Sequence, residues 1–173
     1  MINLRERKII IEKEFNYLTN YGFNLVENTI MSFEESVMNE DKITIVFESD
    51  SRIFKIQYVT KINFLNKKRE KSPQYQLSNN LYEYTLFDIK AKNTESYSDF
   101  SVNNYVLLTN RKLYFQKFNT YNQKYQKGIT NQEYLLIINN YKNLLNNELS
   151  DIMKGKSWIS MFNDRLDGWM IYK

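Results

Sequence analysis

Hydrophobic residues recur over the first twenty residues of the chain at the spacing of an amphipathic helix. The stripe repeats at about 3.6 residues and comprises Leu4, Ile11, Phe15 and Leu18. Gly22 follows directly, at a place where a glycine in the left-handed conformation commonly ends a helix. The pattern therefore predicts a helix over residues 4–21 whose apolar face packs on a sheet.

Two later runs alternate apolar and polar residues with a period of two. They span residues 43–48 and 54–62, and the polar segment Ser49-Asp50-Ser51 lies between them. Such alternation is typical of strands with one face on the core and one face in water. We expect an antiparallel hairpin here, preceded in meander order by weaker strand candidates at 23–30 and 33–38.

Three further segments have less regular patterns. Residues 63–80 are polar and contain the single proline of the chain, so we expect an exposed loop. Residues 81–90 and 105–118 are apolar and aromatic, and their short runs leave helix and strand both open.

The C-terminal part of the chain contains the clearest helix signal. Thr130 and Glu133 have the spacing of a capping box, in which each side chain accepts a hydrogen bond from the backbone of the other residue. A stripe at steps of four and three follows, formed by Tyr134, Ile138, Tyr141, Leu145, Leu149 and Ile152. We expect a helix of about five turns that ends before Gly155 and is buried within the domain. A last short helix is expected over 158–172.

These elements together predict an α+β fold in a single domain over residues 1–173. It would contain an N-terminal helix, an antiparallel meander sheet of about four or more strands, and a long C-terminal helix packed on the sheet. No apolar run approaches the roughly 20 residues of a membrane helix, and cysteine is absent. We therefore expect a cytoplasmic protein without disulfides.

The chain has no histidine and no cysteine. A Ser-His-Asp triad, a Cys-His pair and a zinc site of imidazole or thiolate ligands are therefore excluded. Asn, Lys, Ile, Tyr and Phe are abundant and Gly and Pro are scarce, which indicates an AT-rich bacterial or phage genome. We expect no catalytic residue, no metal site and no cofactor.

One triplet leaves an enzymatic alternative open. Asp88 and Lys90 stand in a D-x-K pattern after an apolar approach, which resembles the last element of the PD-(D/E)xK nucleases. In those enzymes the carboxylate binds a divalent metal and the lysine supports the attacking water. The preceding acid of the motif is not evident in this sequence, so a metal-dependent nuclease is the least favoured interpretation.

Charge is distributed unevenly along the chain. Residues 1–50 contain ten acidic and five basic residues, whereas residues 51–173 contain ten acidic and nineteen basic residues. An acidic rim in the first part would steer and hold a basic protein partner. Its candidate residues are Glu27, Glu34, Glu35, Glu40, Asp41, Glu48 and Asp50. The alternative is that these acids pair with Arg52, Lys55 and Lys61 or are solvated.

A basic and aromatic segment supports a different partner. Residues 103–132 contain no acidic residue, and lysines alternate with aromatic residues over 105–127. Bases would stack on the aromatic rings while the cations hold phosphates. The candidate nucleic-acid-binding residues are Arg111, Lys112, Tyr114, Lys117, Tyr121 and Lys124. The same composition also follows from AT-rich codons and from the need for aromatic residues in the core.

The order of these segments resembles that of small uncharacterised bacterial proteins, several of which look like immunity proteins of polymorphic-toxin loci. The matching segments are Tyr21-Gly22-Phe23, residues 43–47, Phe54-Lys55-Ile56, residues 84–89 and residues 152–155. The resemblance implies a non-enzymatic protein-binding module that neutralises a cognate toxin. A protein partner is thus expected, with nucleic acid as the alternative and the oligomeric state open.

Overall fold

We analysed a computed structural model of the chain. It describes residues 4–32, 40–63, 80–92, 99–118, 129–160 and 170–172. The strand predicted at 33–38 and nearly all of the loop predicted at 63–80 lie outside the described residues.

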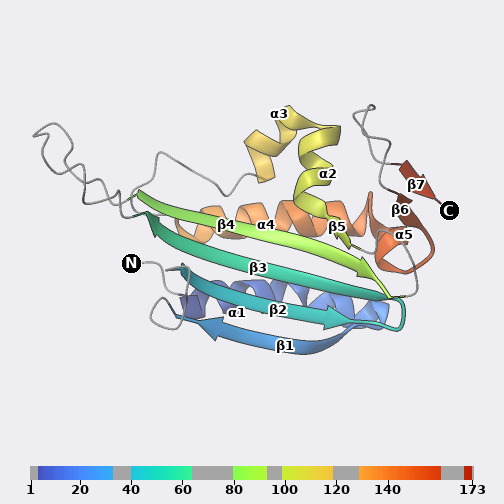
Figure 1. Cartoon of the computed structure of the whole chain (residues 1–173), viewed down its shortest axis with the longest axis horizontal. Helices are drawn as coiled ribbons and strands as arrows, with labels where there is room; N and C mark the ends of the chain where they lie inside the picture. The colour runs from blue at the N-terminus through green and yellow to red at the C-terminus, as the bar shows by residue number, and fades with distance from the viewer. Residues whose placement is uncertain are drawn as a thin grey trace, which may run out of the picture.

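Five strands form one antiparallel sheet in the order β1-β2-β3-β4-β5 (Figure 1). They are β1 (Asn24–Met31), β2 (Glu40–Glu48), β3 (Arg52–Asn63), β4 (Asn80–Ala91) and β5 (Asp99–Ser101). The predicted hairpin is confirmed, since β2 pairs with β3 from Glu40 opposite Lys61 to Glu48 opposite Ile53. The weaker candidate at 23–30 is β1, and the ambiguous segment 81–90 is β4.

Two helical segments cover one face of this sheet. Figure 1 shows α1 (Leu4–Phe15) and α4 (Asn131–Asn146) behind the strands, α1 near β2 and α4 near β4. The predicted N-terminal helix changes to a 3-10 helix, η1 (Asn16–Tyr21), before Gly22 ends it at a φ of 80°. The predicted capping box is also present, with both Thr130 and Glu133 bonded as expected. The predicted α+β class and helix-on-sheet packing are therefore confirmed.

The ambiguous segment 105–118 is helical. It comprises most of α2 (Val102–Thr109), then α3 (Arg111–Leu113) and a π-helical turn, η3 (Tyr114–Phe118). Ser101 begins α2 by accepting a hydrogen bond from the Asn104 N–H, and the Asn110 side chain starts α3 in the same way. α2 contacts β4, and η3 contacts both α2 and α4 (Figure 1).

The predicted C-terminal helix is too long. α4 ends at Asn146, the chain turns over residues 147–149, and α5 (Ser150–Met153) follows. Asn146 and Asn147 favour this interruption, because asparagine competes with the helix through its own backbone hydrogen bonds. Leu149 in the turn and Ile152 and Met153 in α5 are all buried.

The short helix predicted over 158–172 is wrong at both of its ends, and residues 161–169 lie outside the described residues. Residues Trp158–Ser160 form β6, which pairs antiparallel with β7 (Met170–Tyr172). Aromatic and β-branched residues are enriched in strands, and both short segments contain them. The composition of the two described ends therefore favours strands.

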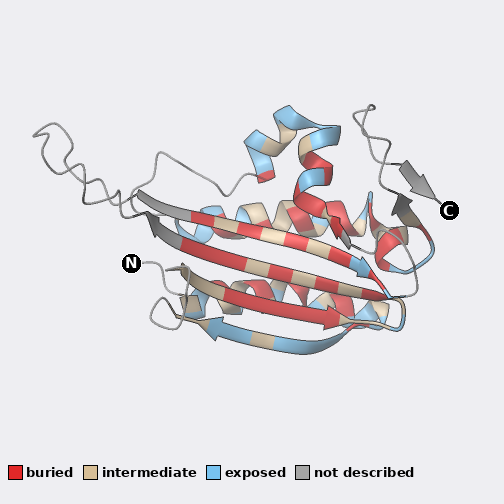
Figure 2. Cartoon of the chain, in the orientation of Figure 1, coloured by how far each residue is buried: buried red, intermediate tan, exposed pale blue. Residues whose placement is uncertain are grey.

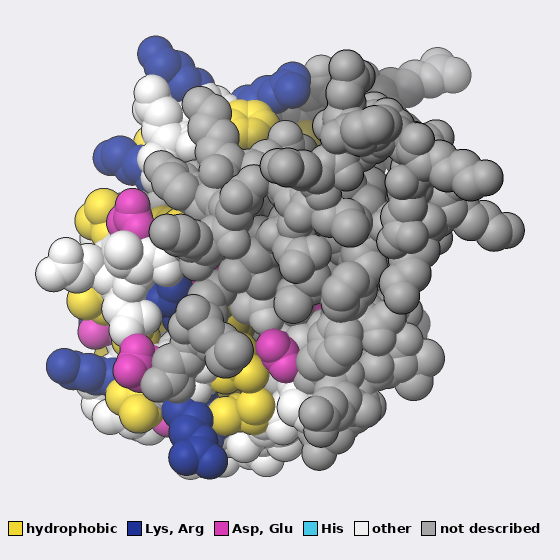
Figure 3. Space-filling view, turned by 90° about the vertical axis from the view of Figure 1, so that its left-hand side faces the viewer, with side chains coloured by type: hydrophobic (Ala, Val, Ile, Leu, Met, Phe, Trp, Pro, Cys, Tyr) yellow, Lys and Arg dark blue, Asp and Glu magenta, His cyan; other side chains and the backbone are white. Residues whose placement is uncertain are grey.

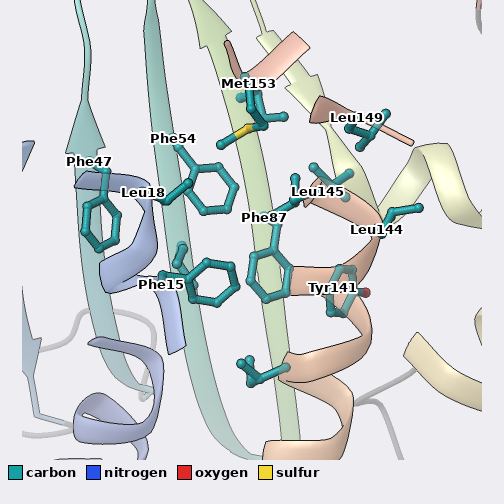
Figure 4. Close-up of a cluster of buried hydrophobic side chains, with 14 of the residues drawn as sticks. Phe15, Leu18, Phe47, Phe54, Phe87, Tyr141, Leu144, Leu145, Leu149 and Met153 are labelled. Atoms are coloured by element: carbon teal, nitrogen blue, oxygen red, sulfur yellow. The ribbon is translucent and has the colours of Figure 1, made fainter. Parts of the chain in front are cut away.

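The core lies between the sheet and the two covering helices. Phe15 of α1 contacts Phe54 and Phe87 at ring-centroid distances of 5.6 and 5.7 Å, and Phe87 lies 4.1 Å from Tyr141 of α4 (Figure 4). All four rings are buried. Buried and half-buried positions alternate along much of β3 and β4 (Figure 2), as the period-2 pattern requires. Aromatic contacts thus join α1, β3, β4 and α4.

Among the described ranges, no helix combines the length and the apolar character that crossing a bilayer requires.

Candidate binding surface

The buried side chains of Arg7 and Glu83 form an ion pair inside the protein. Arg7 and Glu83 are almost completely buried, and their charged groups lie 3.0 Å apart. The Glu83 Oε1 atom also accepts from the Tyr58 hydroxyl at 2.9 Å, and Oε2 accepts from the Ile129 N–H at 3.0 Å. Arg7 Nη1 donates to the Asn131 side chain at 2.6 Å. Both groups are therefore hydrogen-bonded on several sides, as a buried ion pair requires.

Two tyrosines complete this cluster. The Arg7 guanidinium lies 4.4 Å from the centre of the Tyr134 ring, and the Tyr134 hydroxyl is 3.1 Å from the Thr85 hydroxyl. Burial raises the pKa of Tyr134 well above its usual range, and burial with the nearby Glu83 charge does the same to the pKa of Tyr58. Both phenols therefore stay protonated near neutral pH. The bonds of this cluster connect α1, β3, β4 and α4.

A second buried arginine, Arg52 of β3, lies at the C-terminal end of α5. Arg52 donates from Nε to the Ile152 carbonyl at 3.0 Å and from Nη2 to the Ser157 carbonyl at 2.9 Å. Its guanidinium lies 4.7 Å from the centre of the Trp158 ring. Burial lowers the pKa of Arg52, and the carbonyls at the end of α5 favour its positive charge. This arginine fastens the C-terminal segment to β3 and is not a free cation for a ligand.

One edge of the sheet is closed by a side chain. β5 covers only Asp88–Lys90 of the neighbouring β4. Beyond it, the buried Asn103 side chain accepts from the Phe87 N–H and donates to the Thr85 carbonyl, both at 2.8 Å. The Asn103 side-chain amide thus bonds to backbone groups of β4 that a longer β5 would have paired. α2 consequently shields this edge from other strands.

The opposite edge has no such cover within the described residues. β1 pairs with β2 on one side, and no described strand pairs with its other side. Leu25, Val26 and Ile30 of β1 are 47, 54 and 38% exposed. Figure 2 shows β1 as an almost continuously exposed strand beside the buried β2. An edge of this kind offers unpaired backbone groups together with apolar side chains, which is the surface that an added strand recognises.

The acidic residues predicted to form a rim are divided between the two ends of β2. Glu40 and Asp41 begin the strand, and Glu48 ends it, with Asp50 in the turn beyond. Glu27 is exposed on β1 opposite Val46. The two remaining residues, Glu34 and Glu35, lie outside the described residues. The structure thus places only part of the proposed rim beside the open edge.

Two of these acids have partners on the protein itself. Glu48 forms an ion pair with Lys92, and Asp41 accepts from the Thr60 hydroxyl at 3.4 Å. Figure 3 views the end of the molecule at which α1, β2 and α4 begin, and its coloured acidic side chains stand singly among basic, apolar and polar ones. The described residues at this end therefore carry mixed charge.

The basic and aromatic segment is only partly exposed. Arg111, Lys112 and Lys117 are exposed on α3 and η3, and Phe115 is 55% exposed. Tyr114, in contrast, is half-buried against the core, and burial raises its pKa. Tyr121 and Lys124 lie outside the described residues.

Stacking of several bases on this segment has little support from its described rings. The Phe118 ring is buried, and the Phe118 carbonyl accepts from the Tyr141 hydroxyl at 3.0 Å. Phe115 is thus the exposed ring among the described residues of α3 and η3, and the Arg111 guanidinium lies 5.9 Å from its centre. One accessible ring beside three cations is a small platform compared with those of proteins that stack successive bases.

The Asp88-x-Lys90 triplet lies on β4, on the face turned away from α1 and α4. Asp88 stands opposite Lys55 of β3 and Ser101 of β5, so its cross-strand neighbours are a lysine and a serine and not a second carboxylate. In the part of the chain that the structure describes, no group of three acidic residues is arranged to hold a metal ion.

A shallow groove separates α2, α3 and η3 from the end of α4. It consists of two adjoining hollows of about 200 and 220 Å³ that share Leu113, Leu144 and Glu148. Its other polar groups include the Asn143 and Asn147 side chains. Glu148 is the acidic residue of its lining, and this carboxylate accepts from the Tyr105 hydroxyl at 3.5 Å.

Sequence reasoning identified β1 as a weak strand but did not identify it as a surface. Neither did it find the buried roles of Arg7 and Asn103. A signal for Arg7 was present, because it falls four residues before Ile11 on the apolar stripe of the first helix. Comparison of the chain with protein-family models, with curated proteins and with solved structures gives no significant match.

Proposed function

We propose that this chain is a non-enzymatic protein-binding module, and that its partner is a toxin that it neutralises in the manner of an immunity protein. The observation that supports a binding role is the contrast between the two edges of the sheet. Asn103 caps the β4 edge at Thr85 and Phe87, next to the three residues that β5 pairs, whereas β1 presents Leu25, Val26 and Ile30 at the other edge. Exposed apolar side chains on an edge strand, whose outer side no described strand pairs, are a common protein-binding feature.

The absence of histidine and cysteine from the chain is consistent with this proposal. Among the described residues, the charged groups that are most deeply buried, Arg7, Glu83 and Arg52, are bonded within the fold. A protein that acts by occupying its partner requires a defined surface and no reactive side chain.

The experiment is expression of the gene beside each neighbouring reading frame in a sensitive bacterial host. We expect one neighbour to arrest growth alone and the chain to relieve the arrest by forming a stoichiometric complex with the product. A complex of defined stoichiometry from the two purified proteins would complete the support. Neighbours that cause no arrest, or arrest that the chain does not relieve, would contradict the toxin-neutralising role.

A nucleic-acid partner is the second candidate, and it rests on the exposed cations around Phe115. It predicts binding of single-stranded DNA or RNA that weakens steeply as salt is raised, because phosphate contacts release counterions. Arg111→Ala and Lys112→Ala should then weaken binding and reduce its salt dependence. No binding at low salt would remove this candidate.

A further inference from the structure

We propose that the outer edge of β1 is the docking site, and that the partner contributes an extended segment, basic and apolar in composition, as a sixth strand of the sheet. This inference rests on the proposed function, since it names the surface and the chemistry of the segment that binds there. The regular part of the edge runs from Glu27 to Met31, because the register of β1 against β2 shifts between Leu25 and Glu27.

The composition of β1 favours strand addition. Natural edge strands are commonly protected by lysine, proline or a bulge. β1 has the register shift at its beginning, but Asn24–Met31 contains no lysine and no proline. Protection is therefore confined to one end of the strand, and the remaining residues keep the period-2 geometry that an added strand needs.

The side chains of β1 would contribute apolar contacts beside the new backbone bonds. Leu25 and Ile30 stand opposite Phe47 and Ile43, two buried residues on the helix-covered face. Although they point to that face, both remain partly exposed because they lie on the outermost strand. An added strand would extend the apolar face past them and remove this area from water.

Charge indicates which kind of segment binds. Glu27 is the single charged residue of β1 and is exposed. No lysine or arginine occurs in the sequence between Lys13 and Lys42; of the acidic residues that the structure describes there, Glu14 is paired with Lys142, whereas Glu27 lies on β1 and Glu40 begins β2. Of the cations nearby, Lys8 is paired with Glu12, and Lys42 stands opposite Met31 at the end of the strand. A basic segment therefore complements this edge, while a second copy of the chain would bring two acidic edges together.

The first test uses two synthetic probes with the isotope-labelled full chain. One is an eight-residue peptide of alternating lysine and valine, and the other replaces each lysine by glutamate. We expect the lysine peptide to shift the backbone amide signals of residues 27–31 and to slow their hydrogen exchange, with an effect that weakens as salt is raised. Equal responses to both peptides, or shifts that map outside β1, would overturn the inference.

Substitutions test the same edge independently. Val26→Lys adds a cation at the register shift, directly beside the regular edge of residues 27–31, and Leu136→Lys adds one at an exposed site on α4, where the leucine is 65% exposed. We expect the first to weaken binding of the lysine peptide about tenfold or more and the second to leave it unchanged. Thr29→Lys is an alternative edge variant should Val26→Lys not fold. Equal affinity of the edge variant and the control would overturn the inference.

Two further outcomes separate this inference from the proposed function. Where a toxin is found and Val26→Lys binds it as tightly as the natural chain does, the edge is wrong and the function stands. Where no neighbour is toxic but the lysine peptide docks on β1, the edge stands and the toxin-neutralising function fails. A chain that is dimeric by light scattering and becomes monomeric as Val26→Lys would also overturn the inference, because a second copy would then occupy the edge.

Discussion

The side chains of Arg7 and Glu83 meet in the protein interior although they are far apart in the sequence. Their charged atoms are 3.0 Å apart, and the two side chains are only 2 and 3% exposed. The same carboxylate accepts from Tyr58 and from the Ile129 N–H, so a single residue of β4 holds parts of α1, β3 and the segment that precedes α4.

Glu83→Leu should destabilise the protein strongly, because it leaves the Arg7 charge buried without its carboxylate. Loss of one partner of a buried ion pair costs about 3–5 kcal/mol. Urea unfolding at neutral pH measures the loss. Removing both charges, as in Arg7→Met with Glu83→Leu, should cost clearly less than the sum of the single changes. Additive effects in this double-mutant cycle would show that the two groups do not stabilise each other.

Asn103→Leu should destabilise the protein by roughly 2 kcal/mol or more, since it leaves buried backbone groups of β4 without partners. The amide of Phe87 loses its acceptor, so its hydrogen exchange should accelerate. Asn104→Leu is the matched control, because Asn104 is exposed on the same helix and should change stability by no more than about 0.5 kcal/mol. Unchanged protection of Phe87 in Asn103→Leu would contradict the assigned role.

Local patterns were sufficient to predict several elements of the fold. The alternation over 54–62 matches the buried and half-buried positions along much of β3, and the capping box at Thr130 fixed the start of α4. These features depend on neighbours within a few residues, so the sequence displays them directly. The wet face predicted for residues 43–48 is wrong for β2, because all of residues 43–47 are buried. The α+β class follows once a stripe of helical period and a pair of alternating strands are placed in one chain.

Other features depended on contacts between distant parts of the chain. The break after Asn146 lets Leu149 and Ile152 reach the core, and β5 pairs with β4 for three residues before Asn103 takes its place. The open edge is likewise a property of strand order, because β1 shows its outer side only when no other strand is added beyond it. No local pattern in residues 24–31 contains that information.

Among the described residues, two glycines with positive φ provide a matched pair of substitutions. Gly22 has a φ of 80° and Gly155 a φ of 75°. A Cβ at Gly22 would meet nothing within 4 Å, whereas a Cβ at Gly155 would lie 2.4 Å from the Ser51 Oγ atom and 3.3 Å from its Cβ.

Gly22→Ala should therefore cost only the backbone strain of about 1–2 kcal/mol, and Gly155→Ala should cost more. Thermal and urea unfolding of the two variants measure the difference. Adding Ser51→Gly to Gly155→Ala should recover the part that is due to crowding and leave the strain. Equal losses in the two single variants would show that Ser51 moves aside without cost.

Glu133 should make helix α4 sensitive to acid. A hydrogen bond from the Thr130 N–H, and then one from the Thr130 hydroxyl, lower the pKa of the Glu133 carboxyl. Its contribution to stability is therefore complete above the ordinary pKa of a glutamate, near 4.3, and is lost as the pH falls through the lower pKa of the folded state. The difference in unfolding free energy between the natural chain and Glu133→Gln should shrink over this range. A constant difference would contradict the capping role.

Three buried tyrosines should make the protein less stable at alkaline pH. Burial is the main cause that raises the pKa of Tyr58, Tyr134 and Tyr141 in the fold. Because the folded state holds these phenols neutral, their contribution to stability is present below the ordinary tyrosine pKa of about 10 and is lost as the pH rises above it.

In an alkaline titration, the tyrosinate absorbance of the exposed tyrosines should rise first while the circular dichroism stays native. The signal of the three buried phenols should then appear together with the loss of native structure, and on its time course, because unfolding is what gives them access to water. Tyr134→Phe should remove one phenolate from this late step and, since the substitution also removes the hydrogen bond between the Tyr134 and Thr85 hydroxyls, lower stability at neutral pH. Ionisation of all three phenols in the intact fold would show that water reaches them without unfolding.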